Sequence, residues 1–177
     1  LLFLFYSSAI LCVRAVSLAF APGAQEPRCT RVLVKTDEIG DFVIWLDDYM
    51  RFQRDSDILI TTDANAQLAV KMTKFSDVMS FNKKDVILRP HRFLSFLCSL
   101  TKVKTHNVVN CVVSRNSIYS DLICLAVNAA VRTGASQDFK SQSYVEHIFT
   151  QIFYNQTIDL SQYYRHHVSI RNVKMLV

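Results

Sequence analysis

The sequence predicts an α/β protein built on a doubly wound, parallel, Rossmann-like sheet. Short apolar runs suited to buried strands alternate with longer segments of helical periodicity, and brief polar links join them. Parallel strands connected by helices need cover on both faces, which suits a chain whose residues are 50% hydrophobic. A length of 177 residues is enough for one domain with a substantial core.

The first expected strand is Val32–Val34, and the helix that follows it, 41–53, places Trp45 among its apolar side chains. A second strand is expected at 58–61, where isoleucine and leucine form a short apolar run. The helix expected at 63–74 has alanine, leucine and methionine available for burial.

A third strand is expected at 78–81, and a helix at 90–100 begins with proline, which is favoured in a first helical turn. Valines predict a fourth strand at 108–113. The last elements are a helix at 120–131 and a short fifth strand ending at Gly134.

Residues 1–28 form a separate N-terminal part, an apolar helix followed by a linker of proline, glycine and charged residues. The apolar stretch has three interpretations. It could be a signal peptide, a transmembrane helix in which Arg14 would cost about 2.5–3.5 kcal/mol, or a helix lying on a membrane surface. The third is favoured, and the Rossmann-like domain is expected over 29–177.

Composition excludes several classes of function. The net charge of +5 suits anionic partners, but no basic run interleaved with aromatic residues predicts nucleic-acid binding. Five cysteines without a C-x-x-C pair indicate buried thiols of a reducing compartment, and no spacing of cysteine and histidine predicts a metal site. Gly40 alone cannot supply the G-x-G-x-x-G of a dinucleotide site, so no cofactor is expected.

The link between the first strand and its helix is the most informative segment. It contains Gly40, one of only three glycines, which suggests positive φ or close approach of a ligand. Asp41 follows at the first helical turn, where a carboxylate is favoured and could simply cap the helix. Carboxyl ends of parallel strands are where such sheets bind ligands.

The run Val-Leu-Val-Lys-Thr-Asp-Glu-Ile-Gly-Asp at 32–41 closely resembles the opening of glycosyltransferase family nine, the ADP-heptose:lipopolysaccharide heptosyltransferases and their relatives. The segments 113–121, 131–138 and 154–172 resemble later motifs of the same family. The resemblance runs from about Arg31 to the last residue and covers one half of such an enzyme.

The resemblance implies an inverting GT-B glycosyltransferase in which this half binds a lipid-linked or phosphorylated sugar acceptor. A second domain, which this sequence lacks, would bind the nucleotide-sugar donor, with ADP-heptose the leading candidate. The chain is therefore expected to be inactive alone, independent of metal ions, and cytoplasmic, with the inner face of the cytoplasmic membrane as the candidate location. Peripheral membrane contact is expected through residues 1–20.

Asp41 matches the catalytic aspartate of the family and is the candidate general base, whereas Glu38 is a weaker candidate. Four more residues of the motifs are expected to bind substrate, together with Gly40: they are Lys35, Thr36, Asp37 and Arg115. Structural roles remain the alternative for each. Arg132 is a weaker candidate than Arg115 for contact with a phosphate or carboxylate of the acceptor. Arg89, His91 and Arg92, which follow the third strand, are weaker candidates for an extended basic rim.

A second function remains open, because a Rossmann-like module can bind a partner or an anionic ligand without catalysis. Residues 1–20 would then tether that module to a membrane. A second α/β domain encoded downstream would favour the transferase, and a half-sized natural product without a partner chain would favour the binding module.

Overall fold

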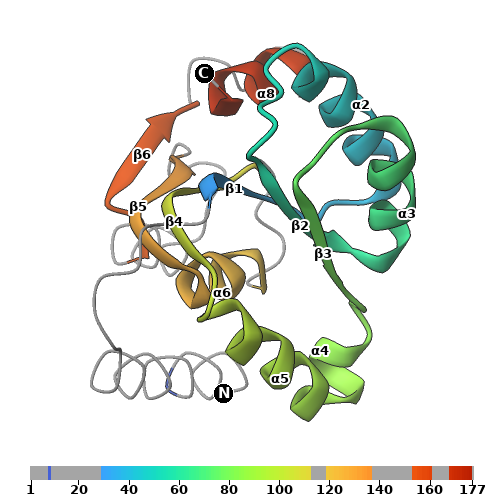
Figure 1. The fold of residues 1–177 in the computed structure, drawn as a ribbon, viewed down its shortest axis with the longest axis vertical. Helices are drawn as coiled ribbons and strands as arrows, with labels where there is room; N and C mark the ends of the chain where they lie inside the picture. The colour runs from blue at the N-terminus through green and yellow to red at the C-terminus, as the bar shows by residue number, and fades with distance from the viewer. Residues whose placement is uncertain (1–7, 9–28, 113–118, 137–152, 161–167, 177) are drawn as a thin grey trace.

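A six-stranded, wholly parallel sheet forms the centre of the molecule, with strand order β3-β2-β1-β4-β5-β6 (Figure 1). The computed structural model describes residues 8, 29–112, 119–136, 153–160 and 168–176. The strands are β1 (Cys29–Lys35), β2 (Ile58–Thr62), β3 (Asp77–Phe81), β4 (Lys104–Asn110), β5 (Asn128–Ser136) and β6 (Gln156–Asp159). This architecture confirms the predicted α/β, Rossmann-like fold.

Helices cover both faces of the sheet, as a parallel sheet requires (Figure 1). The described helices are α2 (Ile39–Met50), α3 (Asp63–Met72), α4 (Asp85–Leu88), α5 (Pro90–Leu100), α6 (Tyr119–Ala126) and α8 (Val168–Leu176). Helices α2, α3 and α8 contribute to the core on one face, and α5 and α6 to the core on the other.

Strand β1 shows how the sequence creates the two cores. Val32 and Val34 belong to the core beneath α5 and α6, whereas Leu33 belongs to the core beneath α2, because successive strand side chains point to opposite faces. Trp45 on α2 is fully buried and stacks on Tyr49 with ring centroids 5.3 Å apart, which confirms the apolar face predicted for this helix.

The C-terminal part differs from the expected elements. The helix predicted at 120–131 ends at Ala126, and β5 already begins at Asn128, so the fifth strand is longer than predicted. The backbone N–H of Asn128 donates to the carbonyl of Val103, which starts pairing with β4 and overrides the helical spacing of the apolar residues. Strand β4 begins and ends earlier in the chain than the strand expected at 108–113. Strand β6 and helix α4 were not predicted.

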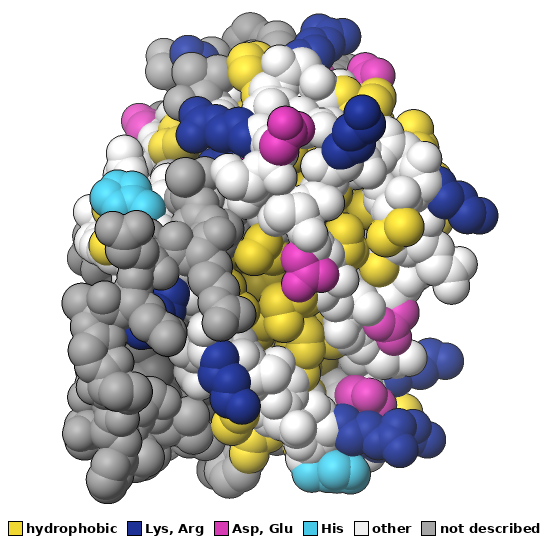
Figure 2. Space-filling model, viewed as in Figure 1, with side chains coloured by type: hydrophobic (Ala, Val, Ile, Leu, Met, Phe, Trp, Pro, Cys, Tyr) yellow, Lys and Arg dark blue, Asp and Glu magenta, His cyan; other side chains and the backbone are white. Residues whose placement is uncertain are grey.

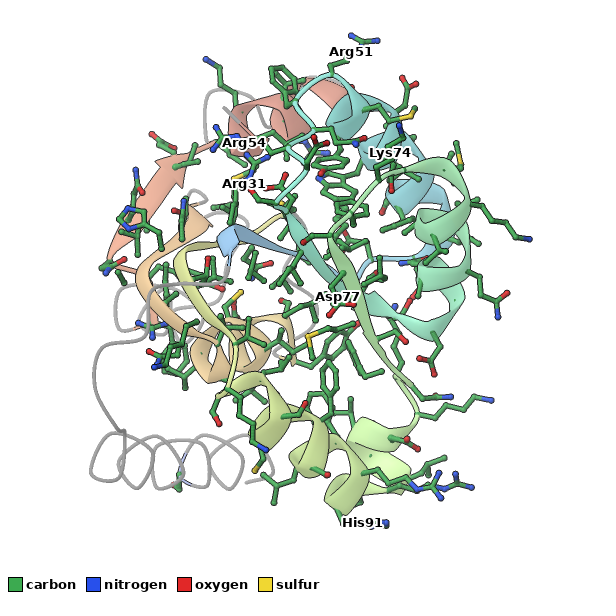
Figure 3. All side chains as sticks on the ribbon, viewed as in Figure 1. Arg31, Arg51, Arg54, Lys74, Asp77 and His91 are labelled. Carbon is green, nitrogen blue, oxygen red and sulfur yellow. The ribbon has the colours of Figure 1, made fainter. Side chains whose placement is uncertain are left out.

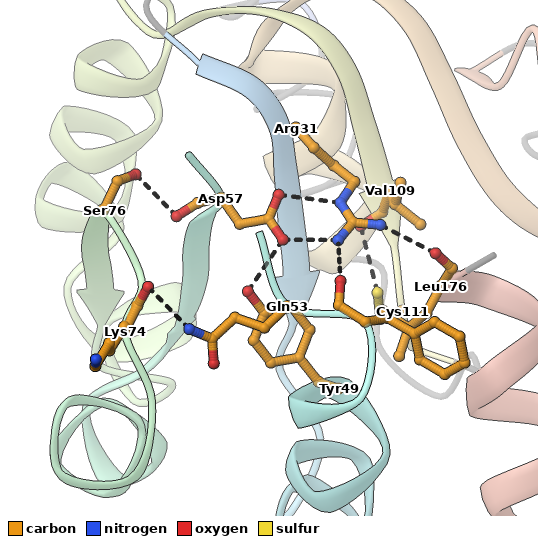
Figure 4. A network of polar contacts seen from close by, with 10 residues as sticks. Arg31, Tyr49, Gln53, Asp57, Lys74, Ser76, Val109, Cys111 and Leu176 are labelled. Atoms are coloured by element: carbon orange, nitrogen blue, oxygen red, sulfur yellow. Dashed lines mark hydrogen bonds and ion pairs between the residues drawn. The ribbon is translucent and has the colours of Figure 1, made fainter. Parts of the chain in front are cut away.

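A buried ion pair holds the amino edge of the sheet together (Figure 4). The guanidinium of Arg31 donates to both carboxylate oxygens of Asp57, at 3.1 and 2.7 Å. The hydroxyl of Tyr49 donates to Asp57, and Arg31 also donates to the carbonyl of Leu176 at the end of α8. This ion pair and its hydrogen bonds therefore connect β1, α2, α8 and the residue just before β2.

No helix within the described residues is long and apolar enough to cross a membrane. The apolar helix expected within residues 1–20 lies outside the described residues, apart from residue 8.

Candidate functional site

The candidate site lies at the carboxyl edge of the sheet, opposite the Arg31–Asp57 ion pair. The strand order reverses between β1 and β4, and open α/β sheets bind ligands where the order reverses. The loop from β1 to α2, residues 36–38, lies at this edge and contains two of the predicted substrate-binding residues, Thr36 and Asp37.

Lys35 bridges β1 and the end of β4 from within the protein. Its side chain is 1% exposed, its ammonium donates to the carbonyl of Cys111 at 3.0 Å, and it pairs with the carboxylate of Asp37. A buried ammonium needs such partners to offset lost hydration. The predicted contact of Lys35 with a substrate anion is therefore unsupported by this geometry, since the ammonium already has an internal counter-ion.

Two further side chains at this edge are buried. Thr36 is fully buried, and its hydroxyl has no hydrogen-bond partner within the described part of the chain. Burial raises the pKa of the Cys111 thiol to about 12, so the thiol is protonated at neutral pH. Asn65 on α3 donates to the carbonyl of Asp37 at 3.0 Å. These contacts fix the base of the loop and leave its outer residues to face solvent.

The backbone of Gly40 does not have the positive φ that was one of the two expectations for this glycine. It lies in the first turn of α2 with no left-handed φ, and a Cβ placed on it would meet nothing within 4 Å. The protein itself therefore does not require glycine here. Close approach of a ligand is the remaining reason for glycine among those considered from the sequence.

Asp41 projects from the first turn of α2 as an exposed carboxylate. Glu38, not Asp41, occupies the N-cap position, and neither side chain makes a capping hydrogen bond. Within the described residues the Asp41 side chain forms no ion pair or hydrogen bond, so the capping alternative lacks its defining contact. An exposed carboxylate here is accessible to a ligand hydroxyl, which a general base must be able to reach.

An ion pair across the edge connects the loops that follow β1 and β3. The ammonium of Lys83 lies 2.7 Å from a carboxylate oxygen of Glu38 and 6.0 Å from the ring centre of Tyr119 on α6. Lys83 therefore links the N-cap residue of α2 to the first residue of α6. Glu38 already has a cationic partner, which makes it a poorer candidate base than Asp41.

We expect Lys83→Met to return the pKa of Glu38 toward its ordinary value of 4.5. The hydrogen bond from Lys83 and its positive charge lower that pKa, so the ion pair persists above the lowered pKa and is lost as pH falls through it. An NMR titration of the Glu38 carboxyl carbon measures the change, with Lys84→Met as the control. A Glu38 titration unchanged by Lys83→Met would contradict the bridge.

A pocket of about 240 Å³ opens beside this bridge, beyond β2 and β3. Aromatic rings and polar groups line it: Asp63, Ser80, Phe81, Asn82, Asp85, Arg92, Phe93 and Phe96. The hydroxyl of Ser80 donates to Asp63 at 2.7 Å, which orients that carboxylate. Carboxylate, amide and guanidinium groups beside aromatic rings suit a polyhydroxylated ligand. The sequence did not predict this pocket, although Arg92 was a candidate for a basic rim.

The other predicted residues are less informative. Arg115 lies outside the described residues, as do His167 and positions 137–138 of the 131–138 motif. Arg132 lies within β5, opposite Val108 of β4, and not at the carboxyl end of its strand. Thr133 likewise pairs within the sheet, so this motif does not follow the fifth strand as expected.

A buried polar cluster beyond β4 was not recognised from the sequence. The amide of Asn110 donates to Asp121 at 3.1 Å and to the hydroxyl of Tyr154 at 2.7 Å, and its carbonyl accepts from the N–H of Val112. Asn110 interrupts a run of valines, and that polar residue in an apolar strand was the available signal. The cluster fixes the chain where β4 gives way to residues 113–118 and α6.

No three histidine, cysteine or acidic side chains within the described ranges lie close enough together to hold a metal ion. The described free cysteines are Cys98, Cys111 and Cys124, of which the last two are buried as expected.

The fold is similar to that of two solved glycosyltransferases. Heptosyltransferase WaaC of E. coli, solved with ADP, is 18% identical with a TM-score of 0.61, over 83% of this chain and 46% of that one. A glycosyl transferase of family 9 from Veillonella parvula is 14% identical with a TM-score of 0.60, over 88% of this chain and 42% of that one. The chain thus spans less than half the length of each. No protein-family model and no curated protein matches the sequence.

Proposed function

We propose that this chain is the acceptor-binding unit of a glycosyltransferase of family nine. The observation that carries the proposal is the exposed Asp41 carboxylate at the carboxyl edge of the sheet, the edge at which a polar and aromatic pocket also opens. The family motif at 32–41 and the fold shared with two glycosyltransferases support it independently.

The proposed reaction is inverting transfer of a sugar, with Asp41 as the base. An acceptor hydroxyl attacks the anomeric carbon of the donor sugar, its proton passes to the Asp41 carboxylate, and the nucleotide leaves with the electrons of the glycosidic bond. A second α/β unit of GT-B type would hold the donor. ADP-heptose is the proposed donor, by resemblance to the family and because the WaaC neighbour was solved with ADP.

The pocket beyond β2 and β3 is the proposed place for the acceptor sugar. Asp63 and Asp85 can accept hydrogen bonds from sugar hydroxyls, and Arg92 can donate to a carboxylate or phosphate of the acceptor. Phe96, which is half-buried, offers an apolar face to the sugar ring, while the buried Phe81 and Phe93 form the floor behind it. Asp37 and Gly40 would form the adjoining wall, whereas the fully buried Thr36 would support them without touching the acceptor. Arg115 is a further candidate for contact with an anionic group.

A lipopolysaccharide-type, lipid-linked acceptor would place the protein at the inner face of the cytoplasmic membrane. This proposed location rests on the family resemblance, and contact through residues 1–20 is part of the same proposal.

A transfer assay with the natural full-length protein tests the function. The protein is incubated with ADP-heptose and a lipopolysaccharide core oligosaccharide freed of its acyl chains, and product mass and ADP release are followed. We expect an oligosaccharide extended by one heptose and an equal amount of ADP. Binding of the oligosaccharide without transfer, in a protein that contains a second α/β domain, would favour a noncatalytic module instead.

Gly40→Ala should separate stability from function. Alanine fits the open space above this helical position and should stabilise the fold by no more than about 0.5 kcal/mol, because Gly40 lies in the first turn, where the helix-propensity penalty of glycine is smaller than in a helix interior. If an acceptor approaches the backbone here, the added methyl group should raise KM for the acceptor. Denaturant unfolding and acceptor titration of the same variant measure both effects, and an unchanged KM would remove Gly40 from the site.

A further inference from the structure

Helix α4 forms an exposed aliphatic tip at one end of the molecule. Ile87 and Leu88 are 75% and 72% exposed, and no residue of this four-residue helix is buried. For comparison, two apolar side chains of α3 are also exposed, Val70 at 66% and Met72 at 46%. Two adjacent, largely exposed aliphatic side chains form a small apolar patch, and such a patch points to a contact surface only together with its polar surroundings.

Basic residues surround this aliphatic tip. Between Asn82 and Arg92 there are four basic side chains and one carboxylate, that of Asp85, a net charge of +3. Lys83 is partly neutralised by Glu38, whereas the other three basic residues are Lys84, Arg89 and Arg92. Figure 2 shows Lys and Arg side chains at this end as well as at the opposite one, and Figure 3 places His91 here and Arg51 at the opposite end.

We propose that this tip, residues 83–92, docks on the surface of an anionic lipid bilayer, with Ile87 and Leu88 inserted between headgroups. The combination of exposed aliphatic side chains and a surrounding ring of cations matches the two components of interfacial binding, apolar burial and attraction to acidic lipid. A specific protein interface buries about 800 Å² on each partner, which is more than a four-residue tip offers.

The tip adjoins the candidate site. Asp85 and Arg92 line the pocket proposed for the acceptor sugar, so a lipid-linked acceptor could present its sugar to the pocket while its acyl chains stay in the bilayer. The inference rests on the proposed function in this respect and deepens it, but the docking itself is tested without any transfer reaction.

Vesicle sedimentation of the full protein tests the docking. Vesicles of phosphatidylcholine alone are compared with vesicles containing phosphatidylglycerol, using Ile87→Ser/Leu88→Ser and, as matched control, Val70→Ser/Met72→Ser. We expect binding to the anionic vesicles that weakens at least tenfold in the α4 variant and less than twofold in the control. No preference for anionic vesicles, or a larger loss of binding in the control than in the α4 variant, would overturn the proposal.

A second measurement reports on the tip itself even if another segment also binds lipid. The single native tryptophan, Trp45, is fully buried, so a new tryptophan gives a separable signal. Brominated lipid should quench the added fluorescence of Leu88→Trp and leave that of Val70→Trp unchanged. Absence of quenching at position 88, or equal quenching at position 70, would overturn the proposal.

An assay of sugar transfer distinguishes the proposed membrane docking from the proposed glycosyltransferase function. The α4 variant should extend a soluble acceptor at the wild-type rate while losing activity on acceptor embedded in vesicles. A wild-type protein that binds anionic vesicles but transfers no sugar would reject the proposed function and support the docking.

Discussion

Asp57→Asn should destabilise the fold by about 3–5 kcal/mol, because it leaves the Arg31 guanidinium buried without a counter-ion. The side chains of Arg31 and Asp57 are 6% and 0% exposed. Asparagine keeps the size and could still accept from Tyr49, so lost charge is the main change. The burial of Tyr49 and the Asp57 carboxylate together raise the pKa of the tyrosine, as expected for a phenol that donates to this anion.

Thermal or denaturant unfolding measures this effect, with Asp55→Asn as the control. Asp55 lies two residues away and is exposed, so its neutralisation should change stability by less than about 0.5 kcal/mol. If Asp57→Asn lowered the free energy of unfolding by no more than the control does, the Asp57 carboxylate would not be needed to stabilise the buried guanidinium of Arg31. The predicted loss should appear without any ligand, because this ion pair lies at the edge opposite the site.

Asp41→Asn should lower kcat by about 10²–10⁴-fold while leaving the fold intact, because the amide cannot take the acceptor proton. The side chain is exposed, and the loss of its interaction with the helix dipole should cost no more than about 1 kcal/mol. Steady-state transfer by the full-length protein measures the change, together with KM for the acceptor, which should vary little.

Asp47→Asn is the matched control for Asp41→Asn, since Asp47 lies on the same helix with a side chain 68% exposed. It pairs only weakly with Arg51, at 3.8 Å, and should retain wild-type turnover. An Asp41→Asn enzyme with the turnover of the control would remove Asp41 from catalysis and leave a purely local role at the helix terminus.

The sequence allowed the sheet to be predicted because its strands are short runs of β-branched and apolar residues bounded by polar links. The prediction of a helix over 127–131 was wrong: Ala129 and Val131 fit a helical spacing but pair with β4 in the structure. Local periodicity cannot reveal a pairing partner that lies about 24 residues earlier in the chain. Strand β6 was missed for the same reason, since its position depends on pairing with β5.

The candidate site was predictable where it depends on local sequence. The position of Asp41 follows from the strand-to-helix junction, and its exposure follows from the helical face. The burial of Lys35 was not predictable, because its partner carbonyl belongs to Cys111, 76 residues later. The pocket was missed because Asp63, Ser80 and Arg92 come from three separate elements.

Hydrogen exchange of the full-length protein, with and without the core oligosaccharide acceptor and without donor, tests the acceptor site most directly. We predict that the acceptor slows exchange in peptides covering residues 36–41 and 80–86 and leaves the Arg31 and Asp57 regions unchanged. Protection confined to the opposite edge of the sheet, or to segments outside residues 29–112, would contradict an acceptor site beside Asp41.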